Sequence, residues 1–184
     1  VVDPGMEPYR TPSDLELNEI VPDSDNAAYD MYDVLVRIFD DEFFEVGEQA
    51  ARNIITGYAR IDGHAVAVVA SQPTVLSGAI DARCSDKAAH FIQICDAFNI
   101  PLVFLMDVPG FWVGKDHEHA GIIRHGAKML HAMASATVPK LTVVTRKGYG
   151  AGYYVMAGRA FEPDLMVAWP GAEISVMGAE GMLG

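Results

Sequence analysis

Residues 139–159 read Pro139-Lys-Leu-Thr-Val-Val-Thr-Arg-Lys-Gly-Tyr-Gly-Ala-Gly-Tyr-Tyr-Val-Met-Ala-Gly-Arg159, and the character of this stretch changes twice. Its apolar run, Leu141–Val144, predicts a buried strand. A loop with three glycines follows, and apolar residues then return at helical spacing. A strand that opens through glycines into a helix leaves backbone N–H groups directed at one place. Such a place can bind a phosphate, a carboxylate or a developing oxyanion.

Phosphate-binding motifs do not fit this loop. The dinucleotide fingerprint G-x-G-x-x-G requires glycine at position 153, which is Tyr153. The nucleotide P-loop requires Gly-Lys followed by Ser or Thr, and the serine-hydrolase elbow requires G-x-S-x-G; neither pattern occurs. What remains is an oxyanion hole, or glycines that only allow a strand and a helix to pack tightly.

Charge is distributed unevenly along the chain. The formal net charge is −12, and 14 of the 25 acidic residues lie in residues 1–50. No acidic residue occurs from His119 to Phe161, whereas six cations do: Arg124, Lys128, Lys140, Arg146, Lys147 and Arg159. A cation-only window around an N–H-rich loop favours an anionic substrate. Nucleic acid fits poorly, because the chain is acidic and has no basic stripe interleaved with aromatic residues.

Length and composition predict one domain with a large core, since 51% of the 184 residues are hydrophobic. No apolar run reaches the ~18–20 residues that span a bilayer, and no signal-peptide pattern is present, so we expect no membrane insertion. Cys84 and Cys95 are too few for a disulfide framework and should be ordinary buried or half-buried thiols. These features predict a cytoplasmic protein, or a mitochondrial-matrix protein if the source is eukaryotic.

The order of elements predicts an α/β fold. Residues 1–25 predict an extended acidic lead-in, and residues 26–184 a domain whose glycine-rich end suggests truncation. The expected helices are Ala28–Ile38 (capped by Asp23–Asp25), Phe43–Ala51, Asp86–Phe98, Asp116–Ala136 and one from Ala151. The expected strands are Asn53–Ile61 and Ala65–Ala70, joined by a hairpin at Asp62-Gly63, then Leu102–Met106, Leu141–Val144 and Leu165–Trp169.

Two of these helices have apolar faces that predict how they pack. In the helix Asp86–Phe98 we expect Ala89, Ile92 and Phe98 to point inward. The helix Asp116–Ala136 carries an apolar stripe of Ile123, Ala127, Leu130 and Ala134. This helix has more apolar surface than one side can bury, which predicts that subunits pack against it.

Other polar residues could form a site. His117, His119 and His125 invite a metal interpretation, but residues i and i+2 of a helix diverge, so we expect capping and surface roles and no metal. Asp107 ends a predicted strand before Val-Pro-Gly110, where it could be a general base or a turn former. Ser71-Gln72-Pro73 is expected to be a structural turn.

Five further motifs occur in a fixed order: Asn53-Ile-Ile-Thr-Gly-Tyr-Ala-Arg-Ile-Asp-Gly63, Ser85-Asp-Lys-Ala-Ala89, Asp107-Val-Pro-Gly-Phe111, Gly121-Ile-Ile-Arg-His-Gly-Ala-Lys128 and Ala168-Trp-Pro-Gly-Ala-Glu-Ile-Ser-Val-Met-Gly178. Together with the glycine loop they closely resemble the C-terminal half of the carboxyltransferase (β) subunit of biotin-dependent acyl-CoA carboxylases. Propionyl-CoA and methylcrotonyl-CoA carboxylases belong to that family. The resemblance covers nearly the whole chain from about Asp14.

The resemblance implies a crotonase-like (ClpP/crotonase) superhelix of β-β-α units. It implies a ligase or transferase that moves a carboxyl group from carboxybiotin, held on a partner carrier protein, to the α-carbon of an acyl-CoA. The implied partners are the biotin carboxyl carrier or biotin carboxylase subunit, the N-terminal carboxyltransferase half, and further copies in a family hexamer. Because such sites form between the N-half of one protomer and the C-half of another, we expect this chain to be inactive alone.

The resemblance also assigns roles within the glycine loop. In this family two successive backbone N–H groups bind the biotin ureido oxygen, and they map to Ala151 and Gly152, with substrate contacts at Gly150, Tyr153 and Tyr154. Two fixed donors would stabilise the charge that builds on this oxygen as the N–CO₂ bond breaks. The freed biotin nitrogen can then remove the α-proton, so no protein general base is required.

Tyr154 departs from the propionyl-CoA type, in which an acidic residue is common at this position. The pattern here leans toward methylcrotonyl-CoA carboxylase and related decarboxylase α subunits. Two alternative functions therefore stay open. The chain could be the α subunit of a biotin-dependent sodium-pumping acyl-CoA decarboxylase, or a non-catalytic binding or assembly module in which the glycines only pack.

Overall fold

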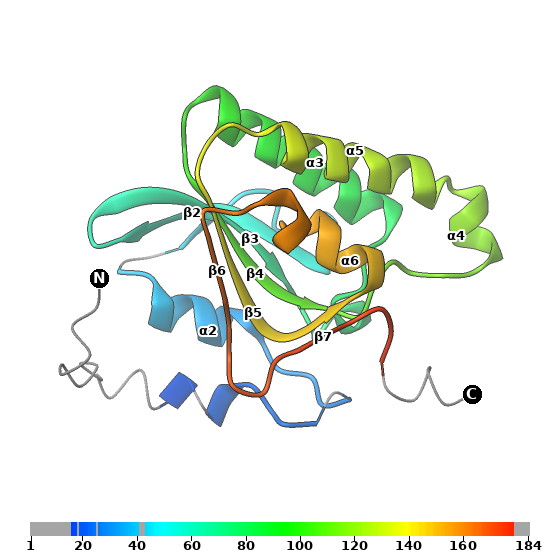
Figure 1. The fold of residues 1–184 in the computed structure, drawn as a ribbon, viewed down its shortest axis with the longest axis horizontal. Coiled ribbons are helices and arrows are strands. Elements are labelled where there is room, and N and C mark those ends of the chain that lie inside the picture. Colours follow the sequence, from blue (N-terminus) through cyan, green and yellow to red (C-terminus); the bar gives the residue numbers. More distant parts are fainter. Residues whose placement is uncertain (1–15, 18, 25, 41–42, 179–184) are drawn as a thin grey trace.

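The computed structural model describes residues 16–17, 19–24, 26–40 and 43–178, and a seven-stranded sheet lies at their centre (Figure 1). The strands follow the order β1-β2-β3-β4-β5-β6, and β7 also pairs with β5. The first three pair antiparallel: β1 (Phe44–Glu45), β2 (Ile54–Ile61) and β3 (His64–Ser71). From β3 onward the pairing is parallel, through β4 (Leu102–Val108), β5 (Lys140–Tyr149), β6 (Leu165–Ala168) and β7 (Glu173–Ser175).

Helices cover both faces of the sheet. Figure 1 shows α2 (Met31–Ile38) on one side, and α3 (Ala82–Ala97) and α5 (Ile122–Ser135) side by side on the other. The short helices are α4 (Lys115–His119), α6 (Gly150–Val155), and the 3₁₀ turns η1 (Leu76–Gly78) and η2 (Arg159–Phe161). Because α6 starts directly where β5 ends, the glycine loop lies at the carboxyl edge of the parallel strands.

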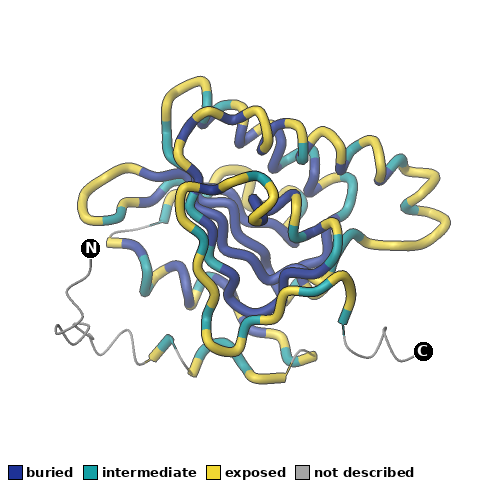
Figure 2. Tube along the Cα trace, viewed as in Figure 1, coloured by how far each residue is buried: buried dark blue, intermediate teal, exposed yellow. Residues whose placement is uncertain are grey.

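The core consists of two clusters, one on each face of the sheet, and Figure 2 shows that the central strands between them are buried. Strand β4 contributes to both: Phe104 and Met106 pack in the cluster with α3 and α5, whereas Val103 and Leu105 pack in the cluster with α2. Every residue of β4 is buried, which confirms the fully buried strand predicted from the run Leu102–Met106. Strands covered on both faces read as continuous apolar runs, and this is why the sequence signal was clear.

The predicted hairpin at Asp62-Gly63 is confirmed, with Ile61 opposite His64 at its end. The strand predicted at Leu165–Trp169 is also confirmed as β6. The predicted helix starts were less accurate. Helix α2 begins at Met31 and not at Ala28, because the Asp30 carboxylate accepts a hydrogen bond from the backbone N–H of Tyr32.

Helix α3 begins four residues before its predicted start. The Asp81 carboxylate caps it by accepting a hydrogen bond from the backbone N–H of Cys84. At its other end Phe98 was expected to point inward, and this is wrong: the residue is 72% exposed. Phe98 is the C-cap, beyond the last helical residue, so the helical periodicity no longer sets its direction.

The helix predicted at Phe43–Ala51 is wrong. Phe44 and Glu45 form β1 and pair with β2, opposite Tyr58 and Gly57. A side chain on Gly57 would collide with the Phe43 ring, since an added Cβ would lie 2.4 Å from its Cζ atom. The strand pairing therefore overrides a weak local helix signal.

The single helix predicted at Asp116–Ala136 is divided into α4 and α5. Gly121 separates them in the left-handed conformation, with φ at 80°. The apolar stripe that begins at Ile123 exists, but it is not the buried face, because Ile123 is 75% exposed while Ile122 and Met129 are buried. Helix α5 thus carries two apolar faces, one in the core and one open.

Residues 16–24 of the predicted lead-in contribute Leu17, Ile20 and Val21 to the core cluster around α2. Residues 1–15, 18 and 25 of the lead-in lie outside the described residues, as does the glycine-rich end at 179–184. Among the described residues, no helix combines the length and apolar character that a membrane span requires.

Both cysteines are free and buried, as expected. Burial raises the pKa of the Cys84 thiol to about 12 and that of the Cys95 thiol to about 11. Since only the thiolate is nucleophilic, we predict that iodoacetamide at pH 8 labels both residues at least ~100-fold more slowly in the folded chain than in urea. Mass spectrometry of timed samples measures both rates. Equal labelling rates in the two states would contradict this burial.

Candidate functional site

The loop singled out in the sequence forms the junction between β5 and α6. Strand β5 continues through Gly148 to Tyr149, and Gly150 then adopts the left-handed conformation, with φ at 55°. Helix α6 starts without a side-chain cap. Within the described part of the chain, no backbone acceptor bonds to the N–H groups of Ala151 or Gly152. This junction therefore offers the two adjacent donors that the sequence predicts, and their binding role stays a prediction.

Gly152 is buried against the neighbouring strand β4. An added Cβ would lie 2.7 Å from Val108 Cγ2 and 3.1 Å from the Cα atom of Gly110. No larger residue fits there without displacing β4 or the chain that follows it. Ala151 differs, because its side chain is exposed. The two expected donors thus tolerate substitution very differently.

An apolar groove of about 510 Å³ opens beside these donors. It runs between α5 and α6, and Ala151 forms part of its wall. The open stripe of α5 lines the opposite side. The large side chains that line the groove as a whole are Phe111, Trp112, Val113, Ile123, Leu130, Tyr154 and Phe161. A substrate that reached the N–H groups of α6 would have this apolar surface next to it.

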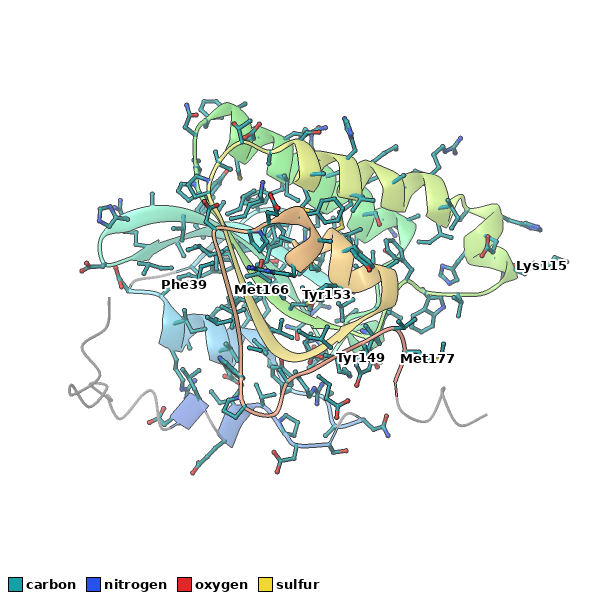
Figure 3. The ribbon with its side chains drawn as sticks, viewed as in Figure 1. Phe39, Lys115, Tyr149, Tyr153, Met166 and Met177 are labelled. Atoms are coloured by element: carbon teal, nitrogen blue, oxygen red, sulfur yellow. The ribbon has the colours of Figure 1, made fainter. Side chains whose placement is uncertain are left out.

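The two tyrosines of α6 point in different directions. Tyr154 is 47% exposed and lines the groove, where its ring meets Phe161 edge-on. Tyr153 is half-buried, and its hydroxyl accepts a hydrogen bond from the Arg159 backbone N–H at 2.9 Å and contacts the Met166 sulfur at 3.7 Å. Figure 3 labels Tyr153 and Met166 near one another. Tyr154 is therefore the residue with access to a ligand, while the Tyr153 hydroxyl is occupied within the chain.

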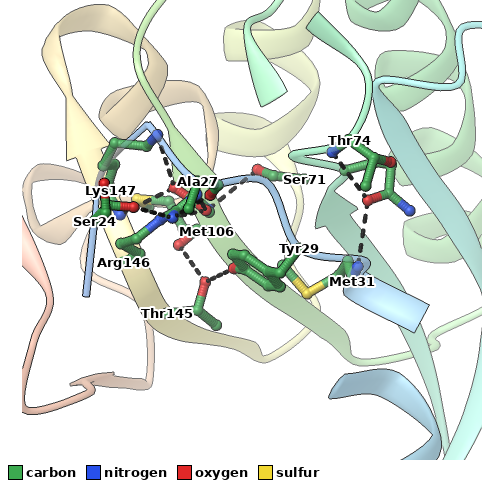
Figure 4. Close-up of polar contacts among 12 residues, drawn as sticks. Ser24, Ala27, Tyr29, Met31, Ser71, Thr74, Met106, Thr145, Arg146 and Lys147 are labelled. Carbon is green, nitrogen blue, oxygen red and sulfur yellow. Dashed lines mark hydrogen bonds and ion pairs between the residues drawn. The ribbon is translucent and has the colours of Figure 1, made fainter. Parts of the chain in front are cut away.

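The buried charges at this edge form a cluster of Asp107, Arg146 and Lys147 (Figure 4). The Arg146 Nη2 atom lies 2.9 Å from Asp107 Oδ2, and the Lys147 ammonium lies 3.8 Å from Asp107 Oδ1. All three side chains are almost fully buried. Two of the six cations in the acid-free window therefore face an acid that the sequence places 39 and 40 residues earlier, so the window is less positive than its sequence suggests.

Other cations of the window are also engaged. The Lys140 ammonium donates to the Ala136 carbonyl oxygen at 2.7 Å, and the Lys128 ammonium pairs with Asp86 at 2.9 Å. Arg124 and Arg159 are exposed. The electrostatic argument for an anionic substrate is thus weaker than the sequence implied, and the argument from the N–H groups at α6 carries more weight.

Asp107 fits neither of the roles expected from sequence. It lies within β4 rather than in a turn, and its fully buried carboxylate is enclosed by Arg146 and Lys147. Above the cluster, Tyr29 stacks on the Arg146 guanidinium at 5.0 Å and hydrogen-bonds with Thr145 at 3.0 Å. Burial, followed by the nearby Asp107 charge, raises the pKa of the Tyr29 hydroxyl, which therefore stays neutral.

The histidines considered as metal ligands contact other partners. His125 pairs with Asp86 at 2.7 Å, and His117 packs against Trp112. Among the described residues, no group of three or more His, Cys, Asp or Glu side chains is placed to hold a metal ion. The Ser71-Gln72-Pro73 segment has the structural role expected, because the Gln72 amide oxygen accepts from the Met31 backbone N–H and Ser71 Oγ accepts from that of Asp107.

Known proteins match this chain along nearly its whole length. A family model described as the carboxyl transferase domain matches residues 2–184. A biotin-dependent long chain acyl-coenzyme A carboxylase beta4 subunit of Mycobacterium tuberculosis is 57% identical over 98% of the chain, which covers 35% of that protein. A methylmalonyl-CoA decarboxylase subunit alpha of Veillonella parvula is 50% identical over 98% of the chain and 35% of its own length.

The solved structures agree with these matches. A transcarboxylase 12S crystal structure, described as a hexamer assembly with methylmalonyl-coenzyme A and methylmalonic acid bound, superposes with a TM-score of 0.89. It is 53% identical, and the match covers 91% of this chain and 33% of that one. The chain therefore spans about a third of the length of the relatives it matches.

Proposed function

This chain belongs to the carboxyl transferase domain family, whose crotonase-like α/β fold it shares, and from that premise we propose that it forms the carboxybiotin-binding part of a biotin-dependent acyl-CoA carboxyltransferase. The reaction proposed is transfer of a carboxyl group from carboxybiotin to the α-carbon of an acyl-CoA. Carboxybiotin enters as a substrate carried by a partner protein. The chain spans about a third of the length of its relatives, and we propose that the site is shared with an N-terminal carboxyltransferase half.

One observation carries the proposal: two adjacent N–H groups, at Ala151 and Gly152, start a helix beside an apolar groove. Donors in an apolar site stabilise an oxyanion far better than donors in water, because nothing must reorganise as charge develops. The ureido oxygen gains such charge when the carboxyl group leaves the neighbouring ring nitrogen of biotin. Gly152 suits this role because the contact with Val108 leaves no space for a side chain between the donor and β4.

The remaining residues of the loop hold these donors in place. Gly150 allows the turn from β5 into α6, since its φ of 55° is strained for any other residue. Directly before the turn, the Tyr149 hydroxyl donates a hydrogen bond to Glu173 at 2.6 Å and so ties the end of β5 to β7. No protein side chain is needed as general base, because the nitrogen released from the carboxyl group can accept the α-proton of the acyl-CoA.

The partners are also part of the proposal. The donor side requires a biotin carboxyl carrier or biotin carboxylase subunit, and the acyl-CoA requires the N-terminal carboxyltransferase half. The open apolar face of α5 supports assembly with further copies, as in the hexamer described for the transcarboxylase 12S relative. We place the working assembly in the cytoplasm, or in the mitochondrial matrix of a eukaryotic source.

The test uses the natural polypeptide that contains this chain, mixed with a biotinylated carrier carrying a ¹⁴C-carboxyl group. We expect label to move from the carrier to an added acyl-CoA, and a carrier without biotin to give none. If the label stays on the carrier with every acyl-CoA of a panel from acetyl to long-chain, the proposal is wrong.

Decarboxylation is a second candidate, favoured by the 50% identity to the decarboxylase alpha subunit. The same donors would then stabilise the same charge in the reverse direction. Label supplied on a carboxylated acyl-CoA and appearing on free carrier biotin tests this direction. A function restricted to binding or assembly predicts transfer in neither direction.

We also propose that Tyr154 contributes to selection of the acyl group, because it is exposed in the groove beside Ala151. Trimming it to alanine should change the ratio of kcat/KM values between short and long acyl-CoAs by about 10–200-fold, the range expected for a few methylenes of pocket. Tyr154→Phe is the matched control, because it keeps the ring in the groove, and it should leave the ratio nearly unchanged. Identical ratios in Tyr154→Ala and parent would place the acyl group elsewhere.

A further inference from the structure

Strand β5 contains a bulge directly before the donor loop. Met106 of β4 faces Val144, and Val108 faces Gly148, so one residue of β4 faces three of β5. The single residue is Asp107. Bulges bend a strand and change the direction of the chain beyond it, and they are frequent beside active sites. This one directs the chain toward Tyr149 and the start of α6.

The Asp107 side chain replaces the ladder hydrogen bonds that the bulge removes. Its Oδ1 atom accepts from the Lys147 backbone N–H at 3.2 Å, and its Oδ2 atom accepts from Arg146 Nε at 3.1 Å. Its own backbone N–H donates to Ser71 Oγ at 3.2 Å. The carboxylate therefore fixes both the backbone and a side chain of the three bulged residues.

The other bulged residues are also held. Thr145 Oγ1 donates to the Met106 carbonyl oxygen at 3.0 Å. The second arm of the Arg146 guanidinium leaves the sheet: Nη1 donates to the carbonyl oxygens of Ser24 and Ala27 at 2.8 and 2.7 Å. Figure 4 shows these contacts converging on Arg146 from the segment that precedes α2. One buried side chain thus links that segment to the base of the donor loop.

We infer that Asp107 and Arg146 are positioning residues: they hold the bulge of β5 so that the N–H groups of Ala151 and Gly152 point at the ureido oxygen. The inference rests on the proposed function. Neither residue lines the apolar groove beside α6. Their effect passes along the continuous backbone from Lys147 to Ala151, and a displacement of about 1 Å at a reacting group can cost 10²-fold in rate.

The test substitutes both members of the pair in the natural polypeptide, because removing one leaves a buried charge unpaired. Asp107→Asn with Arg146→Gln keeps a polar side chain at both positions and removes both charges, and Lys147 loses the carboxylate that lies 3.8 Å from its ammonium. In the folded double variant we expect kcat to fall about 10²-fold while the KM for acyl-CoA stays close to the parent. The control is Asp86→Asn with Lys128→Gln, which removes an exposed ion pair between α3 and α5 and should leave kcat unchanged.

If the double variant does not fold, a second variant tests the positioning role of Arg146. Arg146→Lys keeps the buried charge but lacks the planar fork, so it cannot hold Asp107 and the two carbonyl oxygens together. We expect it to fold and to lose about tenfold in kcat. A folded Arg146→Lys protein with parental kcat would overturn the inference, as would a folded double variant with parental kcat.

Amide hydrogen exchange separates this inference from the proposed function. Residues 148–152 should exchange faster in both Arg146 variants than in the parent and in the Asp86/Lys128 control. If the parent transfers no carboxyl group, the proposed function fails while the exchange result still reports the positioning. If exchange at residues 148–152 is unchanged in the variants, the positioning role is wrong even where carboxyl transfer is confirmed.

Discussion

Replacing Ala151 with proline should lower carboxyl transfer by about 10²–10³-fold. Proline removes one of the two proposed donors, and the exposed side chain of Ala151 and the tolerance of a first helical turn for proline favour a folded variant. Loss of a single oxyanion-hole donor typically has an effect of this size. The loss should appear in kcat, since the donor acts mainly on charge that develops during the reaction.

Gly152→Pro would be the less informative variant. A ring there would collide with Val108, so loss of activity could reflect disruption of β4 packing. Ala151→Val is the matched control, because it adds a side chain as large as proline and keeps the N–H group. Steady-state kinetics of the natural polypeptide should show near-parental kcat for valine and the large loss for proline. Equal rates in both variants would remove Ala151 from the site.

Residues 1–184 expressed alone should be at least about 10³-fold less active than the natural polypeptide that contains them. The reaction develops charge on the ureido oxygen and on the thioester-derived enolate, and each requires its own donors. We assign the described N–H pair at α6 to the first of these. The described cations at the end of β5, Arg146 and Lys147, are engaged by Asp107, which leaves little to bind CoA phosphates.

Transfer of ¹⁴C from a carboxylated carrier, measured side by side for the fragment and the longer polypeptide, checks this prediction. Circular dichroism of the fragment serves as the control that it is folded. Adding the separately expressed N-terminal half should restore part of the activity. A folded fragment that works within tenfold of the longer polypeptide would show that one chain of this length holds a complete site.

Local signals in the sequence were enough for much of the fold. Asp62-Gly63 fixed the hairpin, and the apolar run at Leu102 identified a strand covered on both faces. The predictions of secondary structure were wrong where contacts between residues distant in the sequence determine the structure. Phe44 pairs with β2 although its neighbours suggest a helix, and Gly121 divides α4 from α5 although a single glycine inside a helical pattern is often tolerated.

In the candidate site, too, some features could be predicted from local sequence and others depend on distant contacts. The position of Ala151 and Gly152 at a strand-to-helix junction came from spacing and family resemblance. The buried pair of Asp107 and Arg146 could not be predicted in this way. It depends on the register of two parallel strands and on a bulge, and no local sequence pattern predicts that bulge. One signal was available: both residues lie at the carboxyl ends of neighbouring predicted strands, and such ends meet at one edge of a parallel sheet.

The most direct measurement of the central claim is a crystal structure of the natural polypeptide with biotin bound at this site. The account predicts that the ureido oxygen lies 2.7–3.1 Å, the range typical of oxyanion-hole donors, from the backbone nitrogens of both Ala151 and Gly152, with the apolar groove beside the ligand. A ureido oxygen bound by other groups, with the N–H groups of α6 turned away from it, would contradict the account.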